Sequence, residues 1–218
     1  MTTHVLVLGE NTFPFHRIEE MGPFLTEALG PDATVEITTD RQMLRELDNY
    51  DVFVDYVTDS SLTDEQLDGL HDFISAGGGY FPIHCASDLQ NTASDDPDEL
   101  FESLDEPFPE LRALIGGHFL THPEQSEFEV VIEADHPITA GIDNFTVFDE
   151  PYQVDVADDI TVLATMNHPD LDDYPVLWTR THGDGRICYL SLGHTEEALT
   201  NESVIQLVRN ALAWLHDN

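Results

Sequence analysis

The stretch Ser75 to Asp88, SAGGGYFPIHCASD, indicates the fold most directly. Three glycines precede an apolar run, which ends abruptly at His84 and Cys85. A strand that is buried on both faces of a parallel sheet has this short, continuous apolar sequence. When such a strand turns tightly into a helix, the turn residue lies at the carboxyl edge of the sheet, as in a nucleophile elbow. We therefore expect His84 or Cys85 at that edge, near a helix N-terminus that favours an anion.

The first half of the chain alternates apolar strands with helical patterns. Strand-like runs occupy residues 4–10, 34–40, 51–57 and 79–83, and helical patterns occupy residues 17–29, 41–47 and 62–77. Asp40 and Thr63 are the expected helix caps. This order predicts a doubly wound, mainly parallel sheet with right-handed crossovers. Ligands of such sheets bind beyond the carboxyl ends of the strands.

The second half of the chain has a different pattern. Residues 91–109 are acidic and rich in proline, which is typical of a surface insertion with a short helix. A helix that ends at Gly116-Gly117 follows. We expect added antiparallel strands after it and then a closing helix; the strands fall at residues 127–133, 145–150, 160–166, 174–180 and 185–193, and the helix at about 203–216. No boundary divides the chain cleanly, so residues 1–218 are predicted to form one domain.

The charge balance is extreme, with 44 acidic residues against 7 basic ones and a formal net charge of -37. Periodic apolar segments argue against disorder. The composition therefore indicates a folded protein adapted to molar salt, where the Debye length falls to about 3 Å and an acidic surface is screened. No basic stripe is available to neutralise phosphates, which argues against a nucleic-acid partner.

The sequence also predicts a compartment. No apolar run approaches the roughly 20 residues of a membrane span, and the N-terminus, MTTHVLVLGE, lacks the features of a signal peptide. We therefore expect a cytoplasmic protein with no membrane partner. Cys85 and Cys188 cannot form a disulfide framework, and we interpret both as small buried residues in a reducing compartment.

Most of the eleven histidines precede proline or lie at the edges of predicted elements, where a surface position is the simpler interpretation. His84 differs because it occupies the turn after a buried strand. His194 and Glu196 differ because they emerge together after the buried strand that ends at Gly193. A carboxylate can orient a histidine base by fixing its tautomer. The alternative is an ordinary helix start, with Thr195 as its cap.

Several longer motifs follow one another along nearly the whole chain. They are NTFPFHR, GGGYFPIHCASD, LIGGHFLTHPE, DHPIT, FDEPYQV, YPVLWTRTHGDGRICYLSLGHTEEAL and NALAWL. In order and spacing they resemble the trehalose-utilisation (ThuA-like) family, and GRICYLSLGHTEE is the most specific part. The resemblance implies a flavodoxin-like, class I glutamine amidotransferase-like fold. It also implies a link to trehalose, other disaccharides and keto-sugars.

The resemblance implies roles for individual residues as well. The elbow cysteine of the amidotransferases aligns with His84 rather than Cys85, and their His-Pro-Glu motif aligns with His194-Thr195-Glu196. An imidazole cannot readily replace a thiolate in forming a glutamyl thioester, so we do not expect glutamine hydrolysis. His84, His194 and Glu196 are instead the candidate catalytic residues. His194 would be a base oriented by Glu196, and His84 a second acid or base, or a ligand.

Further polar residues are expected around the same cleft. The candidate substrate-binding residues are His16, His118, His122, Glu150 and Tyr152. His84, His122 and His194 are candidate ligands of a divalent metal such as Zn²⁺, although no H-x-x-x-H spacing supports one. A small sugar is the expected substrate. Trp178 could stack on a carbohydrate, but a core position is the preferred interpretation.

Three alternatives stay open from the sequence. The pocket could be lined by histidines without a metal, the protein could bind a sugar without catalysis, or it could be a metal-dependent hydrolase. The subunit count is also open, since an acidic surface is compatible with a homo-oligomer.

Overall fold

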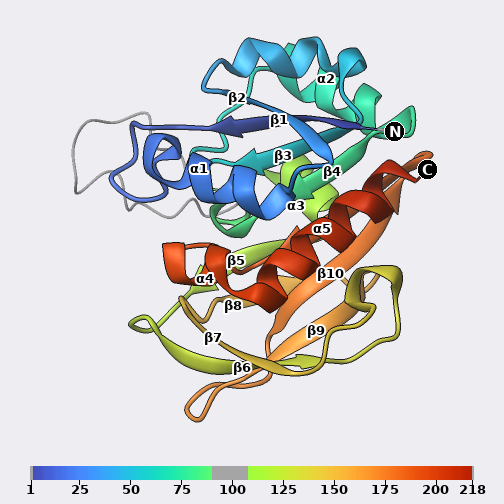
Figure 1. The fold of residues 1–218 in the computed structure, drawn as a ribbon. Helices are drawn as coiled ribbons and strands as arrows, with labels where there is room; N and C mark the ends of the chain where they lie inside the picture. The colour runs from blue at the N-terminus through green and yellow to red at the C-terminus, as the bar shows by residue number, and fades with distance from the viewer. Residues whose placement is uncertain (1, 90–107, 218) are drawn as a thin grey trace.

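The computed structural model describes residues 2–89 and 108–217. In this part of the chain, nine strands form one sheet in the order β2-β1-β3-β4-β11-β10-β9-β6-β7, and β5 pairs with β8 in a second sheet (Figure 1). The strands are β1 Thr3–Gly9, β2 Ala33–Thr38, β3 Val52–Tyr56, β4 Gly79–Pro82, β5 Gly117–Thr121, β6 Ser126–Ile132, β7 Phe145–Asp149, β8 Gln153–Val156, β9 Thr161–Asn167, β10 Pro175–His182 and β11 Gly185–Leu190.

The large sheet has a parallel half and an antiparallel half. Strands β2, β1, β3, β4 and β11 run parallel to their neighbours in this half. Strands β10, β9, β6 and β7 are then added in alternating directions. The predicted doubly wound sheet with added antiparallel strands is therefore confirmed. Most of the insertion expected at residues 91–109 lies outside the described residues.

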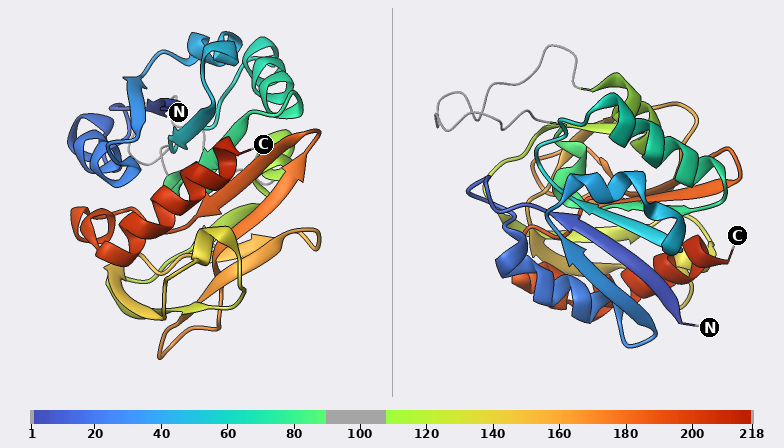
Figure 2. Two further views of the ribbon diagram at one scale, coloured as in Figure 1. Left: turned by 45° about the vertical axis from the view of Figure 1, so that its right-hand side comes forward. Right: turned by 90° about the horizontal axis from the view of Figure 1, so that it is seen from above.

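Helices cover both faces of the sheet. Helices α1 Ile18–Leu29, α4 Glu196–Thr200 and α5 Glu202–His216 pack on one face, and α2 Asp64–Ser75 and α3 Pro109–Ile115 pack on the other (Figure 2). Both faces need this cover because the sheet is apolar on each side. In strand β1, for example, the side chains alternate between two hydrophobic clusters. Val5 and Val7 belong to the first, and Leu6 and Leu8 belong to the second. Burial of both faces explains the continuous apolar sequence.

The segment expected to be a helix at residues 41–47 forms two short 3-10 turns instead, Arg41–Arg45 and Leu47–Asn49. Asp40 caps the first turn, as expected, by accepting a hydrogen bond from the Gln42 amide. The reason for the tighter winding is its close packing on α2. A Cβ atom added at Gly69 of α2 would lie only 2.3 Å from the Leu44 carbonyl oxygen. A short, crowded segment of this kind does not extend into a full α-helix.

The small sheet was not expected from the sequence. The helix predicted to end near Gly116-Gly117 ends at Ile115, and Gly116 adopts a left-handed backbone with φ 76°. The chain then enters β5, which pairs with β8. This ribbon lies close to the end of β4, because the ring of Tyr152, directly before β8, is 4.2 Å from the ring of His84, which follows β4.

The antiparallel half of the sheet returns toward the carboxyl ends of the parallel strands. Strand β7 lies four places from β11 in the sheet order. Even so, the Asp149 side chain at the end of β7 accepts hydrogen bonds from the backbone just after β11. The sheet must therefore curl. The alternating directions also give β7 the same orientation as β11, so that residues after β7 emerge at the same edge.

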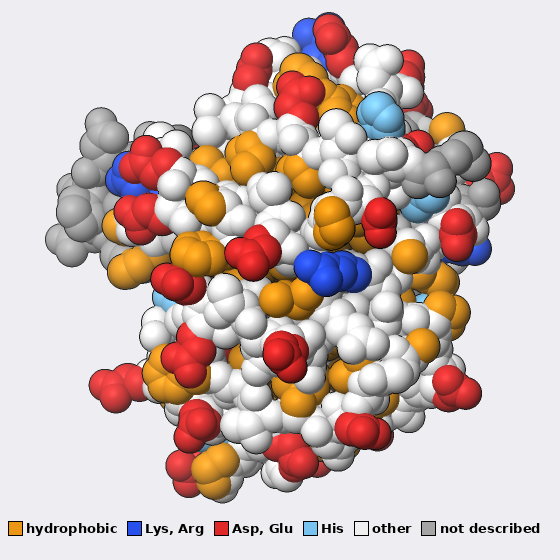
Figure 3. All heavy atoms as spheres, viewed as in Figure 1, with side chains coloured by type: hydrophobic (Ala, Val, Ile, Leu, Met, Phe, Trp, Pro, Cys, Tyr) orange, Lys and Arg blue, Asp and Glu red, His pale blue; other side chains and the backbone are white. Residues whose placement is uncertain are grey.

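One face of the molecule illustrates the distribution of charged side chains. Acidic side chains are scattered over the face shown in Figure 3, where basic ones are few. Among the described residues, we find no helix with the length and apolar character that crossing a bilayer requires.

Candidate functional site

Four strand ends bring three histidines and one glutamate together. His16 lies in the loop after β1, His84 follows β4, Glu150 follows β7 and His194 follows β11. One ligand atom from each of these residues lies within 4.8 Å of all the others. We call these four residues the histidine cluster. It lies at the carboxyl edge of the sheet, where ligands of doubly wound proteins bind.

His84 occupies a true elbow. Its φ of 48° is left-handed, which costs a residue other than glycine about 1–3 kcal/mol and persists only where surrounding contacts impose it. The ring is fully buried, and Nδ1 lies 2.7 Å from the Ser191 carbonyl oxygen. A carbonyl can only accept, so Nδ1 carries the proton. The lone pair of Nε2 then faces His194 Nδ1 at 3.3 Å and Glu150 Oε2 at 3.5 Å.

Two buried hydroxyl groups hold the elbow in this conformation. The carbonyl oxygen of His84 accepts a hydrogen bond from Tyr189 at 2.9 Å, and Ser87 Oγ lies 3.3 Å from the same oxygen. The two hydroxyl oxygens are 2.6 Å apart. The ring of Tyr152 packs against the imidazole of His84, with the centroids 4.2 Å apart. Tyr152 is almost fully buried, so it supports His84 rather than presenting its phenol to a substrate.

His194 is held through its backbone. The carboxylate of Asp149 accepts hydrogen bonds from the amides of Gly193 at 2.7 Å and His194 at 3.1 Å. Tyr56 donates to the Gly193 carbonyl at 2.8 Å. Burial raises the pKa of Asp149, while the nearby histidines and these amide hydrogen bonds act in the opposite direction. Asp149 could not be recognised from the sequence, because no local pattern marks a side chain that binds backbone 44 residues away.

The Nδ1 atom of His194 is the centre of the cluster. It lies 2.8 Å from His16 Nε2 and 3.0 Å from Glu150 Oε2. Burial, together with the neighbouring His84 and His194, lowers the pKa of His16 well below its ordinary value, so His16 is neutral. Burial acts to raise the pKa of Glu150, but the neighbouring His194 and His84 outweigh it and leave the pKa below its ordinary value. Glu150 is therefore an anion.

The His16 ring is fixed from behind by a chain of polar contacts. Its Nδ1 lies 3.1 Å from the hydroxyl of Thr58. The amides of Thr58 and Asp59 both donate to Glu10 Oε1, at 2.7 and 2.9 Å, and Arg41 lies 3.7 Å from the other oxygen of Glu10. The position of Glu10, directly after β1, was the only sequence signal for this support.

The donor set fits a divalent transition metal. Glu150 can only accept, so His194 Nδ1 carries a proton toward it, and that single N–H faces two further acceptors, His16 Nε2 and His84 Nε2. A cation in its place would satisfy all these lone pairs at once. Four ligands at the usual Zn–N distance of about 2.0–2.1 Å would be separated by roughly 3.3 Å. Four of the six separations among these atoms run from 2.8 to 3.5 Å, and all lie within 4.8 Å. The Nδ1 partners of His16 and His84 also match the outer hydrogen bonds that orient metal-bound histidines.

Not every expected residue belongs to this cluster. Glu196 is exposed in the first turn of α4, and Thr195 caps that helix by accepting from the Ala198 amide at 3.0 Å. Thr195 and Glu196 therefore form an ordinary helix start, which was the alternative interpretation of this motif, and the helix directs Glu196 into solvent. The carboxylate beside His194 is Glu150, from a strand that is distant in sequence.

His118 and His122, two of the expected substrate-binding residues, differ in their position relative to the histidine cluster. His118 lies on β5 opposite Asp155. Burial and the nearby Arg112 lower its pKa, and it is not part of the cluster. His122 lies at the rim, with Nε2 3.7 Å from Glu150 Oε2 and a side chain that is 35% exposed. Its Nδ1 is 2.7 Å from the Pro123 carbonyl oxygen, which places the proton there and leaves the Nε2 lone pair facing the cluster. Of these candidates, His16 rather than His122 converges with His84, His194 and Glu150.

Cys85 and Trp178 lie in the protein core. Cys85 is fully buried, and burial raises the pKa of its thiol well above the ordinary value, so it is no nucleophile. Trp178 is also fully buried and donates its indole N–H to the Ile115 carbonyl at 2.8 Å. It cannot stack on a sugar in this position.

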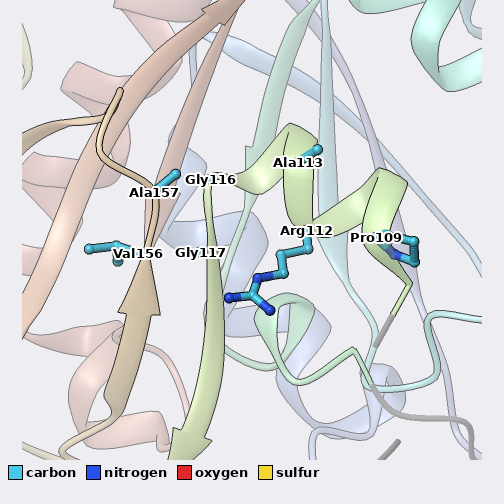
Figure 4. Close-up of a pocket in the computed structure, with 7 residues that line it drawn as sticks. All are labelled: Pro109, Arg112, Ala113, Gly116, Gly117, Val156 and Ala157. Atoms are coloured by element: carbon cyan, nitrogen blue, oxygen red, sulfur yellow. The ribbon is translucent and has the colours of Figure 1, made fainter. Parts of the chain in front are cut away.

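A separate hollow of about 340 Å³ lies between α3 and the β5-β8 ribbon (Figure 4). It is lined by Pro109, Arg112, Ala113, Gly116, Gly117, Val156 and Ala157. None of these residues belongs to the histidine cluster. Since Arg112 is paired with Asp155, the hollow offers no unpaired charge from this arginine to a ligand.

Fold and site together define a class: doubly wound α/β proteins with an elbow at the sheet edge, here with histidine at the elbow. The chain matches the ThuA family, described as trehalose utilisation, over residues 4–215, and it belongs to that family. A comparison with curated proteins found no match.

Solved structures support the fold. A ThuA-like protein from Bacteroides uniformis has a TM-score of 0.77 and 20% identity, covering 98% of this chain and 91% of that one. A ThuA-like protein from Parabacteroides merdae has a TM-score of 0.78 and 14% identity, covering 100% and 91%. The cytoplasmic protein STM1381 from Salmonella typhimurium has a TM-score of 0.66 and 16% identity, covering 97% and 99%.

Proposed function

We propose that this protein is a metal-dependent enzyme of carbohydrate metabolism that acts on a keto-sugar derived from trehalose or a related disaccharide. The observation that carries the proposal is the convergence of three imidazole nitrogens and one carboxylate oxygen within 4.8 Å. The family's description, trehalose utilisation, supports the substrate class. A small sugar also suits a chain with a net charge of -37 better than a nucleic acid does.

His16, His84, His194 and Glu150 would hold the metal. Three nitrogen donors and one oxygen donor favour Zn²⁺, Mn²⁺, Fe²⁺, Co²⁺ or Ni²⁺ over Mg²⁺ or Ca²⁺, which prefer oxygen ligands alone. When bound, such an ion supplies Lewis-acid polarisation of a sugar carbonyl. The carboxylate of Glu150 offsets part of its charge.

His122 is the residue that can move a proton. Its Nδ1 proton is directed to the Pro123 carbonyl, so the lone pair of Nε2 is available on the side that faces Glu150. We assign it the role of the base that removes a proton from the carbon next to the sugar carbonyl. This step leaves an enolate on the sugar and an imidazolium on His122. The partial exposure of His122 allows exchange of the proton with solvent.

His84 and His194, which the sequence suggested either as catalytic acid and base or as metal ligands, have ligand roles in this proposal. The Nδ1 proton of His84 is committed to the Ser191 carbonyl, and its Nε2 faces the cluster. Glutamine hydrolysis is not part of the proposal, since the elbow carries an imidazole and Cys85 is buried. A cytoplasmic location, which the name of the Salmonella protein states for that protein, belongs to the proposal.

The test is metal content together with turnover. Protein purified in molar salt without chelator should hold close to one transition metal ion per chain by elemental analysis. It should convert a keto-disaccharide made by oxidising one secondary hydroxyl of trehalose. The His84→Ala variant should lose both the bound metal and the turnover of the keto-disaccharide. The His71→Ala variant is the matched control, because His71 also contacts another imidazole, that of His182 at 3.2 Å, outside the cluster.

Each outcome has a defined meaning. Metal binding with turnover that survives His84→Ala would contradict the site. Sugar binding by calorimetry without turnover would favour the non-catalytic alternative. Turnover by protein from which all metal has been removed would favour the metal-free histidine pocket.

A further inference from the structure

Three large hydrophobic side chains are substantially exposed among the described residues: Phe15 at 50%, Ile37 at 41% and Leu120 at 54%. A single exposed apolar residue is common on protein surfaces and by itself indicates nothing. Phe15 differs because it immediately precedes His16 in the histidine cluster. Its ring centroid lies 6.5 Å from the rings of both His16 and His194.

The loop that carries Phe15 has two backbone constraints beside this residue. Pro14, before it, restricts the backbone, and His16, after it, has a left-handed φ of 58°. The ring of Phe15 meets that of Phe13 edge to face at 5.8 Å. Phe13 is itself buried and stacks on His16 at 6.2 Å. The rings of Phe13 and His16 therefore lie beside the exposed ring of Phe15, next to the atoms that would hold the metal.

We propose that Phe15 is the platform for the apolar face of the sugar ring, whose oxygen atoms face the histidine cluster. A pyranose has one face rich in C–H groups, and aromatic rings bind such faces through apolar contact and the ring quadrupole. The buried Trp178 is not available for this contact. An aromatic side chain beside polar, ligand-binding atoms is the arrangement that orients a molecule with one apolar face and several hydroxyls. This inference rests on the proposed function, because it assumes a sugar ligand.

Calorimetry at molar salt, with trehalose and its singly oxidised keto derivative as probes, tests the inference. Wild type should bind at least one of them. Phe15→Ala should weaken that binding about tenfold, which corresponds to about 1.4 kcal/mol, and Phe15→Trp should retain it. Ile37→Ala is the control for loss of an exposed apolar side chain and should bind like wild type. Metal content should stay unchanged in all three variants.

The outcomes separate this inference from the proposed function. Equal sugar affinity in wild type and Phe15→Ala would overturn the platform and leave the proposed function standing. Loss of metal together with sugar binding in Phe15→Ala would also overturn it, because Phe15 would then support the loop of His16. A metal-loaded wild type that binds neither probe would overturn the sugar assignment, and the platform with it.

Discussion

Replacing Tyr189 with phenylalanine tests whether the elbow of His84 is imposed by its buried hydrogen bonds. The substitution removes one oxygen atom and keeps the ring, which packs against Trp178 at 4.2 Å. The His84 carbonyl loses the donor at 2.9 Å and retains only the Ser87 hydroxyl, at the longer distance of 3.3 Å.

Two effects follow, and their sizes can be worked from these contacts. The loss of one buried hydrogen bond lowers the free energy of unfolding by about 1–2 kcal/mol. A left-handed residue other than glycine stores about 1–3 kcal/mol, so a weakened clamp lets the His84 turn relax away from the ligand position. Relaxation worth about 1.4 kcal/mol weakens metal binding tenfold, within the range of about 10–100-fold found for residues that orient metal ligands.

The assay is a competition titration with a metal-binding dye at molar salt, with thermal unfolding measured in parallel. Tyr80→Phe is the matched control. Tyr80 is a fully buried tyrosine whose hydroxyl donates to Asp55 at 2.8 Å, outside the cluster. Both variants should lose stability, but only Tyr189→Phe should lose metal affinity. Unchanged metal affinity in Tyr189→Phe, or equal losses in both variants, would show that the Tyr189 hydrogen bond does not hold His84 in its ligand position.

Three further outcomes are expected. Glu150→Gln should reduce metal affinity at least tenfold, whereas Glu196→Gln should leave it unchanged. A metal titration in which Glu196→Gln loses affinity and Glu150→Gln does not would restore Glu196 to the site. Burial raises the pKa of Asp55 to about 7 from 3.8, against the Tyr80 hydrogen bond and the Arg41 charge, so folded protein binds a proton that unfolded protein has released. The free energy of unfolding should therefore fall as pH rises between about 4 and 7, by at most about 1.4 kcal/mol per pH unit for this group. Denaturant titrations of Asp55→Asn should lack this contribution to the slope. An identical slope in the variant would disprove the assignment. Finally, circular dichroism should show unfolding as salt is diluted from molar to about 0.01 M, where screening extends to about 30 Å, and a fold that persists there would remove the halophilic interpretation.

The sequence predicts the parts of the site that depend on neighbouring parallel strands. His84 and His194 each follow an apolar strand, and β4 and β11 are adjacent in the sheet. Strand ends of this kind lie at one edge whatever the details of the helices. The elbow could be predicted for the same reason, since a buried strand followed by small residues has few other continuations.

The rest depends on contacts that local sequence does not encode. Glu196 was chosen as the partner of His194 because it is two residues away, but the helix that begins there directs it into solvent. Glu150 occupies that place because the antiparallel half of the sheet curls until β7 ends against β11. This curl depends on register and twist across four strand pairs. Asp149 has the same origin, as it binds the amides of Gly193 and His194 from that strand.

Anomalous X-ray diffraction from crystals of protein purified without chelator in molar salt would locate a bound metal directly. We expect one strong metal peak, about 2.0–2.2 Å from His16 Nε2, His84 Nε2, His194 Nδ1 and a Glu150 oxygen. A metal peak held by other residues, such as His71 and His182, with none at the histidine cluster, would contradict this expectation.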